Sequence, residues 1–192
     1  MLPRRATKHT DVGSETKMLA DWRHLKAYVL LGEPGSGKSS AFRQEYEANP
    51  NDSVLLTARD FVTIGPPESS EGKVLFIDGL DERRASSANA AGPLDDIRIK
   101  LKQLGNPRFR ISCREADWIT SDTTLLGAVA PDGLVQELHL EPLDSDEIIS
   151  LLSSWTPKRL RNPHSFVEKS EQQHLSALLG NPFLLNLLVS AL

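Results

Sequence analysis

The stretch AYVLLGEPGSGKSS, residues 27–40, decides the fold class of this chain. Its first five residues are all apolar, which is typical of a buried strand, and residues 39–48 follow with a helical pattern. The loop between them matches G-x-x-x-x-G-K-[ST], in which the glycines let successive backbone N–H groups point at one phosphate chain. The sequence therefore predicts a nucleotide-binding loop between a strand and a helix.

Each residue type in this loop has a task in holding a nucleotide. Lys38 is expected to reach the β- and γ-phosphates, and Ser39 to offer its hydroxyl to Mg²⁺. The helix that begins near Lys38 directs its positive end at the same place. The predicted nucleotide-binding residues of the loop are Gly32, Glu33, Pro34, Gly35, Ser36, Gly37, Lys38, Ser39 and Ser40.

The composition fits one globular domain with a sizeable core, at 192 residues, 39% hydrophobic and 25% charged. The net charge of −4 gives no global basic field for nucleic acid. Cys113 is the only cysteine, so an internal disulfide is excluded. The longest apolar run, residues 182–192, is too short to span a bilayer. These features predict a soluble, cytoplasmic protein that does not bind membranes.

Short β-rich runs recur between helical patterns such as that of residues 94–105. This alternation predicts a parallel sheet in an α/β layer fold. The predicted strands are 27–31, 53–58, 73–78, 108–113 and 134–140.

The chain divides into three predicted segments. Residues 1–24 are polar and expected to be loose, with a short helix around 15–23. Residues 25–143 form the core, and residues 144–192 a small helical lid, because the pattern there becomes wholly helical. Asp144 with Glu147, and Ser165 with Glu168, have the spacing of capping boxes at two helix starts of this lid.

The second half of the predicted site follows two further strands. KVLFID, residues 73–78, delivers Asp78 to the carboxyl end of a strand, where it is expected to hold Mg²⁺ opposite Ser39. Asp81 and Glu82 come within one turn and are candidates to orient or deprotonate the water that attacks the γ-phosphate. Arg114 ends another strand, where a guanidinium can read a γ-phosphate or hold a neighbouring acid.

Together, GEPGSGKSS, VLFIDGLDE, RISCRE, PLDSDEIISLL and GNPFLLNLL resemble the NACHT-type branch of the STAND class of P-loop ATPases, over about residues 25–192. DGLDE is the most specific element of this resemblance. The resemblance implies a three-layer ASCE core with a parallel sheet of order 5-1-4-3-2, followed by the lid, with ATP and Mg²⁺ as ligands and slow, switch-like hydrolysis. It also implies that Arg114 is a sensor arginine and that Pro182 packs near the adenine.

Proteins of this class continue into a winged-helix domain, and from the resemblance we expect the given sequence to stop before such a domain. The helix expected at residues 182–192 is apolar on nearly every face and has no cap. We therefore expect a truncated chain that self-associates through the ATPase core and this helix.

Three other functions remain open. A GTPase needs an N-K-x-D motif, and none occurs. A small-molecule or nucleoside kinase needs a basic lid, which Lys158, Arg159 and Arg161 could supply, but that scheme gives DGLDE no role. A non-catalytic interaction module would bind nucleotide only for stability.

Overall fold

The computed structural model describes residues 2–85, 92–155 and 160–191. The chain forms two compact units. The larger consists of Pro3–Glu33 and Lys38–Leu140, and the smaller of Met1–Leu2, Pro34–Gly37 and Glu141–Leu192.

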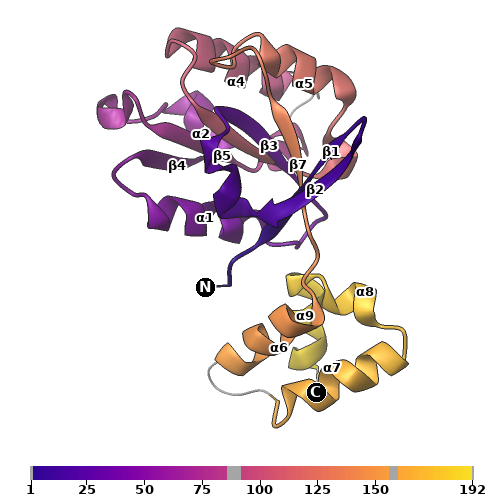
Figure 1. Ribbon diagram of the computed structural model, residues 1–192. Coiled ribbons are helices and arrows are strands. Elements are labelled where there is room, and N and C mark those ends of the chain that lie inside the picture. Colours follow the sequence, from indigo (N-terminus) through magenta and orange to yellow (C-terminus); the bar gives the residue numbers. More distant parts are fainter. Residues whose placement is uncertain (1, 86–91, 156–159, 192) are drawn as a thin grey trace. The chain divides into compact units, whose positions relative to one another are not determined.

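A seven-stranded sheet forms the centre of the larger unit (Figure 1). Neighbouring strands lie in the order β2-β1-β7-β3-β6-β5-β4. The strands β7, β3, β6, β5 and β4 run parallel to one another, whereas β1 is antiparallel to both β2 and β7. In chain order the strands are β1 (Arg5–Thr10), β2 (Gly13–Met18), β3 (Ala27–Leu31), β4 (Ser53–Thr57), β5 (Val74–Asp78), β6 (Phe109–Cys113) and β7 (Gln136–Leu140).

The prediction of a purely parallel sheet with the order 5-1-4-3-2 is wrong, because the sheet is mixed and has seven strands. The additional strands are the hairpin β1–β2, in a segment that was expected to be loose. Its residues are mostly polar, and every residue of β2 is exposed, so no alternation of apolar residues marks these strands in the sequence. The helix expected around residues 15–23 is also wrong in extent, because β2 occupies its first half and a 3₁₀ helix, η1 (Leu19–His24), its second.

Helices cover both faces of the sheet, with α4 and α5 on one side and α1 on the other (Figure 1). Alternate side chains of β3 explain this arrangement, because successive residues of a strand point to opposite faces. Val29 and Leu31 belong to the core cluster that includes α2 to α5, whereas Tyr28 and Leu30 pack with α1 and η1. The helices are α1 (Lys38–Ala48), α2 (Ala58–Thr63), α3 (Leu80–Ala85), α4 (Gly92–Gln103) and α5 (Thr120–Gly127), with short 3₁₀ turns η2 (Glu68–Ser70) and η3 (Glu115–Asp117).

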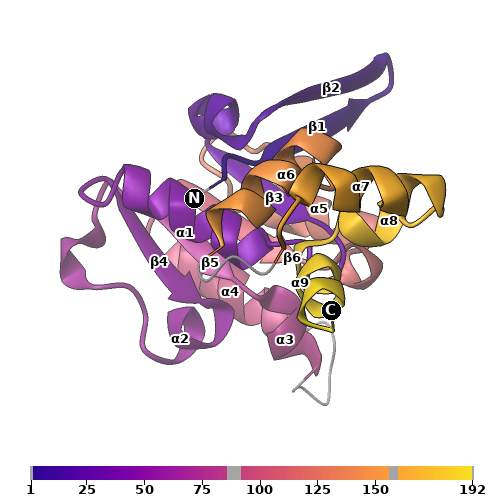
Figure 2. The ribbon, with the colours of Figure 1, turned by 90° about the horizontal axis from the view of Figure 1, so that it is seen from below.

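The smaller unit contains the four helices α6 (Ser145–Ser154), α7 (Pro163–Gln172), α8 (Ser176–Leu179) and α9 (Pro182–Ser190), drawn in orange to yellow in Figure 2. The predicted capping box at the start of α6 is confirmed, since the Asp144 carboxylate accepts from the Glu147 N–H at 2.9 Å. The one predicted at Ser165 is wrong. Asn162 caps α7 instead, by accepting from the Ser165 N–H at 3.1 Å, which allows Pro163 to occupy the first turn.

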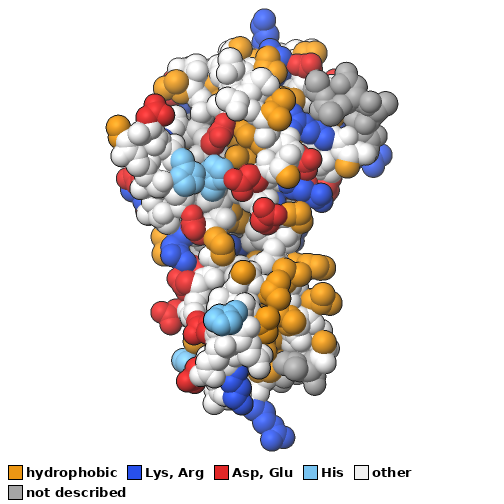
Figure 3. Space-filling view, turned by 90° about the vertical axis from the view of Figure 1, so that its right-hand side faces the viewer, with side chains coloured by type: hydrophobic (Ala, Val, Ile, Leu, Met, Phe, Trp, Pro, Cys, Tyr) orange, Lys and Arg blue, Asp and Glu red, His pale blue; other side chains and the backbone are white. Residues whose placement is uncertain are grey.

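The helix α9 contributes to the core of the smaller unit and also has an exposed apolar face. Leu185 and Val189 are buried in this core, while Phe183 and Leu187 are 60% and 58% exposed. Hydrophobic side chains gather on this unit in Figure 3, where they are orange. Self-association through this face remains a prediction. No helix among the described residues is long and apolar enough to cross a membrane.

Candidate functional site

The glycine-rich loop leaves the buried end of β3 and leads directly into α1, which begins at Lys38. All five residues of β3 are buried, so the start of the loop is fixed by the core. The first backbone N–H groups of a helix have no partner within the helix and carry its positive end. The position is therefore suited to an anion. Ser39 and Ser40 are exposed in the first turn of α1.

Lys38 is half-buried and lies against the loop that precedes it. Its Nζ donates to the carbonyl oxygen of Gly32 at 2.7 Å and to that of Glu33 at 3.1 Å. Burial lowers the pKa of Lys38 below its ordinary value of 10.5, and the charges of Asp81 and Asp78 act in the opposite direction. The ammonium has therefore lost part of its water, and among the described residues no carboxylate contacts it directly.

The middle of the loop, Pro34–Gly37, contacts the start of α9 within the smaller unit. Asn181 Nδ2 donates to the Pro34 carbonyl at 2.8 Å, and the Phe183 N–H to the Gly35 carbonyl at 3.3 Å. Gly35 has a φ of +74°, and a Cβ atom there would lie 2.6 Å from the Cβ of Phe183. Only glycine fits this position. Pro182 lies between the two contacting residues, in the first turn of α9.

Asp78 lies at the carboxyl end of β5, and a serine of the neighbouring strand holds it. Ser112 Oγ donates to Asp78 Oδ1 at 2.5 Å and accepts from the Gly79 N–H at 2.8 Å. Ser112 is buried and belongs to β6, which pairs with both β5 and β3. Because carboxyl ends of parallel strands meet at one edge of a sheet, Asp78 lies at the same edge as the start of the loop.

Asp81 and Glu82 follow in the first turn of α3 and have different surroundings. Asp81 is buried and pairs with Arg114, at 2.7 Å between Oδ2 and Nε. Glu82 is exposed and bends over Gly79, whose φ is +79°. Gly79 thus forms the turn between Asp78, at the end of β5, and the two acids Asp81 and Glu82, at the start of α3. Of these two, only Glu82 has a carboxylate open to a water molecule.

Cys113 is a buried residue of β6. Burial, followed by the charge of Asp81, raises the pKa of Cys113 to about 12. A thiol with this pKa stays protonated at neutral pH, and the thiolate is the reactive form.

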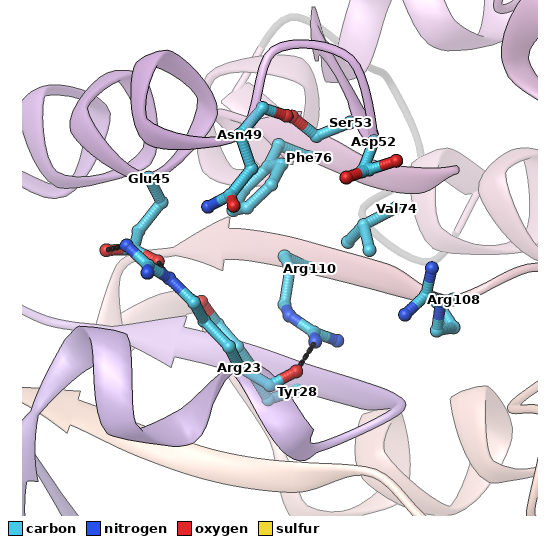
Figure 4. A pocket seen from close by; sticks show the side chains of 10 residues that line it. All are labelled: Arg23, Tyr28, Glu45, Asn49, Asp52, Ser53, Val74, Phe76, Arg108 and Arg110. Carbon is cyan, nitrogen blue, oxygen red and sulfur yellow. Dashed lines mark hydrogen bonds and ion pairs between the residues drawn. The ribbon is translucent and has the colours of Figure 1, made fainter.

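The cavity shown in Figure 4 lies at the opposite edge of the sheet, where the strands begin. It measures about 240 Å³ and is lined by residues such as Tyr28, Val74 and Arg110, which are the first or second residues of β3, β5 and β6. Arginine side chains that line this cavity already pair with protein groups. Arg23 pairs with Glu45 at 2.6 Å, and Arg110 donates to backbone carbonyls including that of Lys26 at 2.9 Å. None of the residues predicted from the sequence lines this cavity.

Two residues that contact the predicted site were not identified from the sequence, Ser112 and Asn181. Ser112 is a small polar residue between Ile111 and Cys113 of a strand, and this is the signal that could have singled it out. Asn181 precedes a proline at a helix start, which predicts a cap and does not predict contact with a distant loop.

The remaining predictions have mixed outcomes. Within residues 2–85, 92–155 and 160–191, no group of three or more His, Cys, Asp or Glu side chains could hold a metal ion. Of the basic residues considered for a kinase lid, Lys158 and Arg159 lie outside the described residues, and Arg161 is exposed.

Compared with models of known protein families and with curated proteins, the chain matches none of them.

Proposed function

We propose that this chain binds ATP together with Mg²⁺ through residues 32–40 and hydrolyses it slowly, as a nucleotide-dependent switch. One observation carries the proposal. The Lys38 ammonium is partly desolvated at the start of α1, and within the described part of the chain its hydrogen bonds go to two loop carbonyls and not to a carboxylate. A phosphate chain at this position would provide a negative charge in contact with the Lys38 ammonium. It would also accept hydrogen bonds from the backbone N–H groups at the start of the helix.

The magnesium ion would be held by Asp78 and Ser39. Ser112 fixes the orientation of the Asp78 carboxylate through a hydrogen bond of 2.5 Å, which leaves the second carboxylate oxygen for the ion or its water shell. The bound ion supplies charge neutralisation at the β- and γ-phosphates. The resemblance to NACHT-type ATPases agrees with these roles and is a resemblance only.

For hydrolysis we assign the base to Glu82. As the water oxygen attacks the γ-phosphorus, its proton passes to the Glu82 carboxylate, and the bond from the γ-phosphorus to the β-phosphate oxygen breaks. Asp81 is less suited, because its carboxylate is buried and paired with Arg114 at 2.7 Å. Its role is to hold Arg114, whose half-exposed guanidinium is available to a γ-phosphate.

The switch would act through the middle of the loop. Since Pro34 and Gly35 accept hydrogen bonds from Asn181 and Phe183, a phosphate that changes the loop conformation also changes the stability of the smaller unit. We place this activity in the cytoplasm, where ATP and Mg²⁺ are available.

A pair of substitutions tests this assignment. Asp78→Asn should weaken Mg²⁺-dependent ATP binding, whereas Glu82→Gln should leave ATP bound and stop turnover, because it removes the base without altering the metal ligand. Glu71→Gln, an exposed glutamate in a loop, is the matched control and should change neither. Normal hydrolysis by Glu82→Gln, together with loss of hydrolysis in Asp81→Asn, would transfer the base to Asp81.

A further inference from the structure

The hairpin strand β2 forms one open edge of the seven-stranded sheet. All six of its residues are exposed, and among the described strands only β1 pairs with it. An edge strand of this kind presents N–H and C=O groups that another strand can pair with. The register of β2 against β1 determines which residues present them.

Opposed residues of an antiparallel hairpin either exchange backbone hydrogen bonds or do not, and side-chain contacts show which pairs of β1 and β2 belong to each class. Thr7 Oγ1 and Thr16 Oγ1 are 2.6 Å apart, and His9 Nδ1 and Ser14 Oγ are 2.7 Å apart. Directly opposed side chains come this close in the pairs that do not exchange backbone hydrogen bonds. Arg4 and Leu19, the pair that follows Arg5 and Met18, belong to the other class, because the Leu19 N–H donates to the Arg4 carbonyl at 2.8 Å.

The odd-numbered residues of β2 therefore direct their backbone groups toward β1. The even-numbered residues, Ser14, Thr16 and Met18, direct their N–H and C=O groups away from the sheet, because these directions alternate along a strand. Thr16 is the middle one of the three.

The charges on β2 are arranged symmetrically about Thr16. Glu15 precedes it and Lys17 follows it, on the same face of the strand, with 2.6 Å between Lys17 Nζ and Glu15 Oε1. These side chains are 54% and 42% exposed. An antiparallel copy of the strand, centred on Thr16, would place each Glu15 opposite the Lys17 of the other copy.

We propose that β2 pairs antiparallel with β2 of a second copy of this chain, about a two-fold axis at Thr16, so that two sheets join edge to edge. Thr16 faces Thr16, and Ser14 faces Met18 of the second copy. The pairs at Ser14, Thr16 and Met18 make about six backbone hydrogen bonds between the two copies. Between these pairs, Glu15 of each copy faces Lys17 of the other in a pair that makes no backbone hydrogen bond, where side chains lie closer together. Lys17 also lies 5.1 Å from the centre of the Trp22 ring, which limits its motion.

The other edge of the sheet lacks such a pattern. The edge strand there is β4, SVLLT, which contains no charged residue to select a register. The β2 contact is small, so the dimer should be weak and require concentrations in the range of about ten to hundreds of micromolar. It depends on no nucleotide and is thus independent of the proposed function.

Disulfide trapping tests the register. In the proposed pairing, the two Thr16 Cα atoms are about 5.5 Å apart, within reach of a disulfide. The two Ser14 Cα atoms are at least about 13 Å apart, because they lie four residues apart along the paired strands. In a glutathione buffer, Thr16→Cys should give a disulfide-linked dimer and Ser14→Cys should not. The native Cys113 is buried and should not contribute.

Charge variants in the Thr16→Cys background test the partner. Glu15→Lys places like charges opposite each other and should lower the rate of cross-linking about tenfold. Adding Lys17→Glu to that variant restores opposite charges and should restore the rate. Lys102→Glu, on an exposed position of α4, is the control and should leave the rate unchanged. Equal cross-linking of the two cysteine variants, no effect of Glu15→Lys, or no restoration in the double charge variant would overturn the proposal.

Discussion

Ser112→Ala should damage both stability and magnesium-dependent nucleotide binding, because one hydroxyl makes two hydrogen bonds. Ser112 Oγ donates to Asp78 at 2.5 Å and accepts from the Gly79 N–H at 2.8 Å, and the residue is 1% exposed. A hydrogen bond to a charged group contributes about 1.5–3 kcal/mol and a neutral one about 1 kcal/mol. Since Asp78 is only partly buried, water can replace the lost donor, and we expect a loss of about 2 kcal/mol in the free energy of unfolding.

The effect on binding should be separable from the effect on stability. Without Ser112 the Asp78 carboxylate is free to rotate, and loss of a group that orients a metal ligand costs about 10- to 100-fold in metal affinity. Denaturant unfolding measures the first effect, and titration of ATP at varied Mg²⁺ concentrations measures the second.

Ser53→Ala provides the matched control. Ser53 is also a buried strand serine, and its hydroxyl donates to a single backbone carbonyl, that of Asn49, at 2.6 Å. We expect it to lose about 1 kcal/mol of stability and to keep its Mg²⁺-dependent affinity for ATP. If Ser112→Ala loses stability but binds ATP and Mg²⁺ as tightly as Ser53→Ala does, then Asp78 is not the metal ligand and the reasoning is refuted.

Two further predictions concern the loop. Because burial lowers the pKa of Lys38 below 10.5, ATP affinity should fall as the pH rises through that lowered pKa, and binding there should take up protons, since the phosphate favours the charged lysine. Calorimetry in two buffers of different ionisation enthalpy measures this uptake, and a release of protons would contradict the prediction. Gly35→Ala should lower the free energy of unfolding by more than the roughly 1–2 kcal/mol expected from its positive φ alone, because its Cβ would lie 2.6 Å from Phe183. Gly72→Ala, with a φ of +76° and no atom within 4 Å, has only the backbone effect, so equal losses in the two variants would refute the clash.

The sequence predicts those parts of the structure that rest on strong apolar patterns. AYVLL and VLFI are runs of apolar residues that are almost all buried, and the strands β3 and β5 form there, with the loop and Asp78 following them. The short hairpin β1–β2 could not be predicted in this way, because its stability comes from cross-strand pairs such as Thr7 with Thr16. Such pairs have no periodic signal.

The side-chain partners of Arg114 and Asp78 in the candidate site could not be predicted from the sequence either. Arg114 was predicted either to read a phosphate or to hold an acid, and the choice of Asp81 as its partner depends on how α3 lies beside β6. The pairing of Asp78 with Ser112 joins residues 34 positions apart through the parallel register of β5 and β6. Contacts of this kind depend on the exact register of neighbouring strands and on the positions of helices beside them, and no sequence pattern gives either.

The central claim is that the loop at residues 32–40 binds the phosphates of ATP, and titration calorimetry with Lys38→Ala tests it most directly. Lys38 provides the cation, so its removal should cost about 1.5–3 kcal/mol of binding free energy, or at least about tenfold in Kd, in the presence of Mg²⁺. Lys102→Ala, which removes an exposed lysine of α4, should bind as the unchanged chain does. ATP binding by Lys38→Ala that equals that of Lys102→Ala, or no ATP binding by the unchanged chain, would contradict the claim.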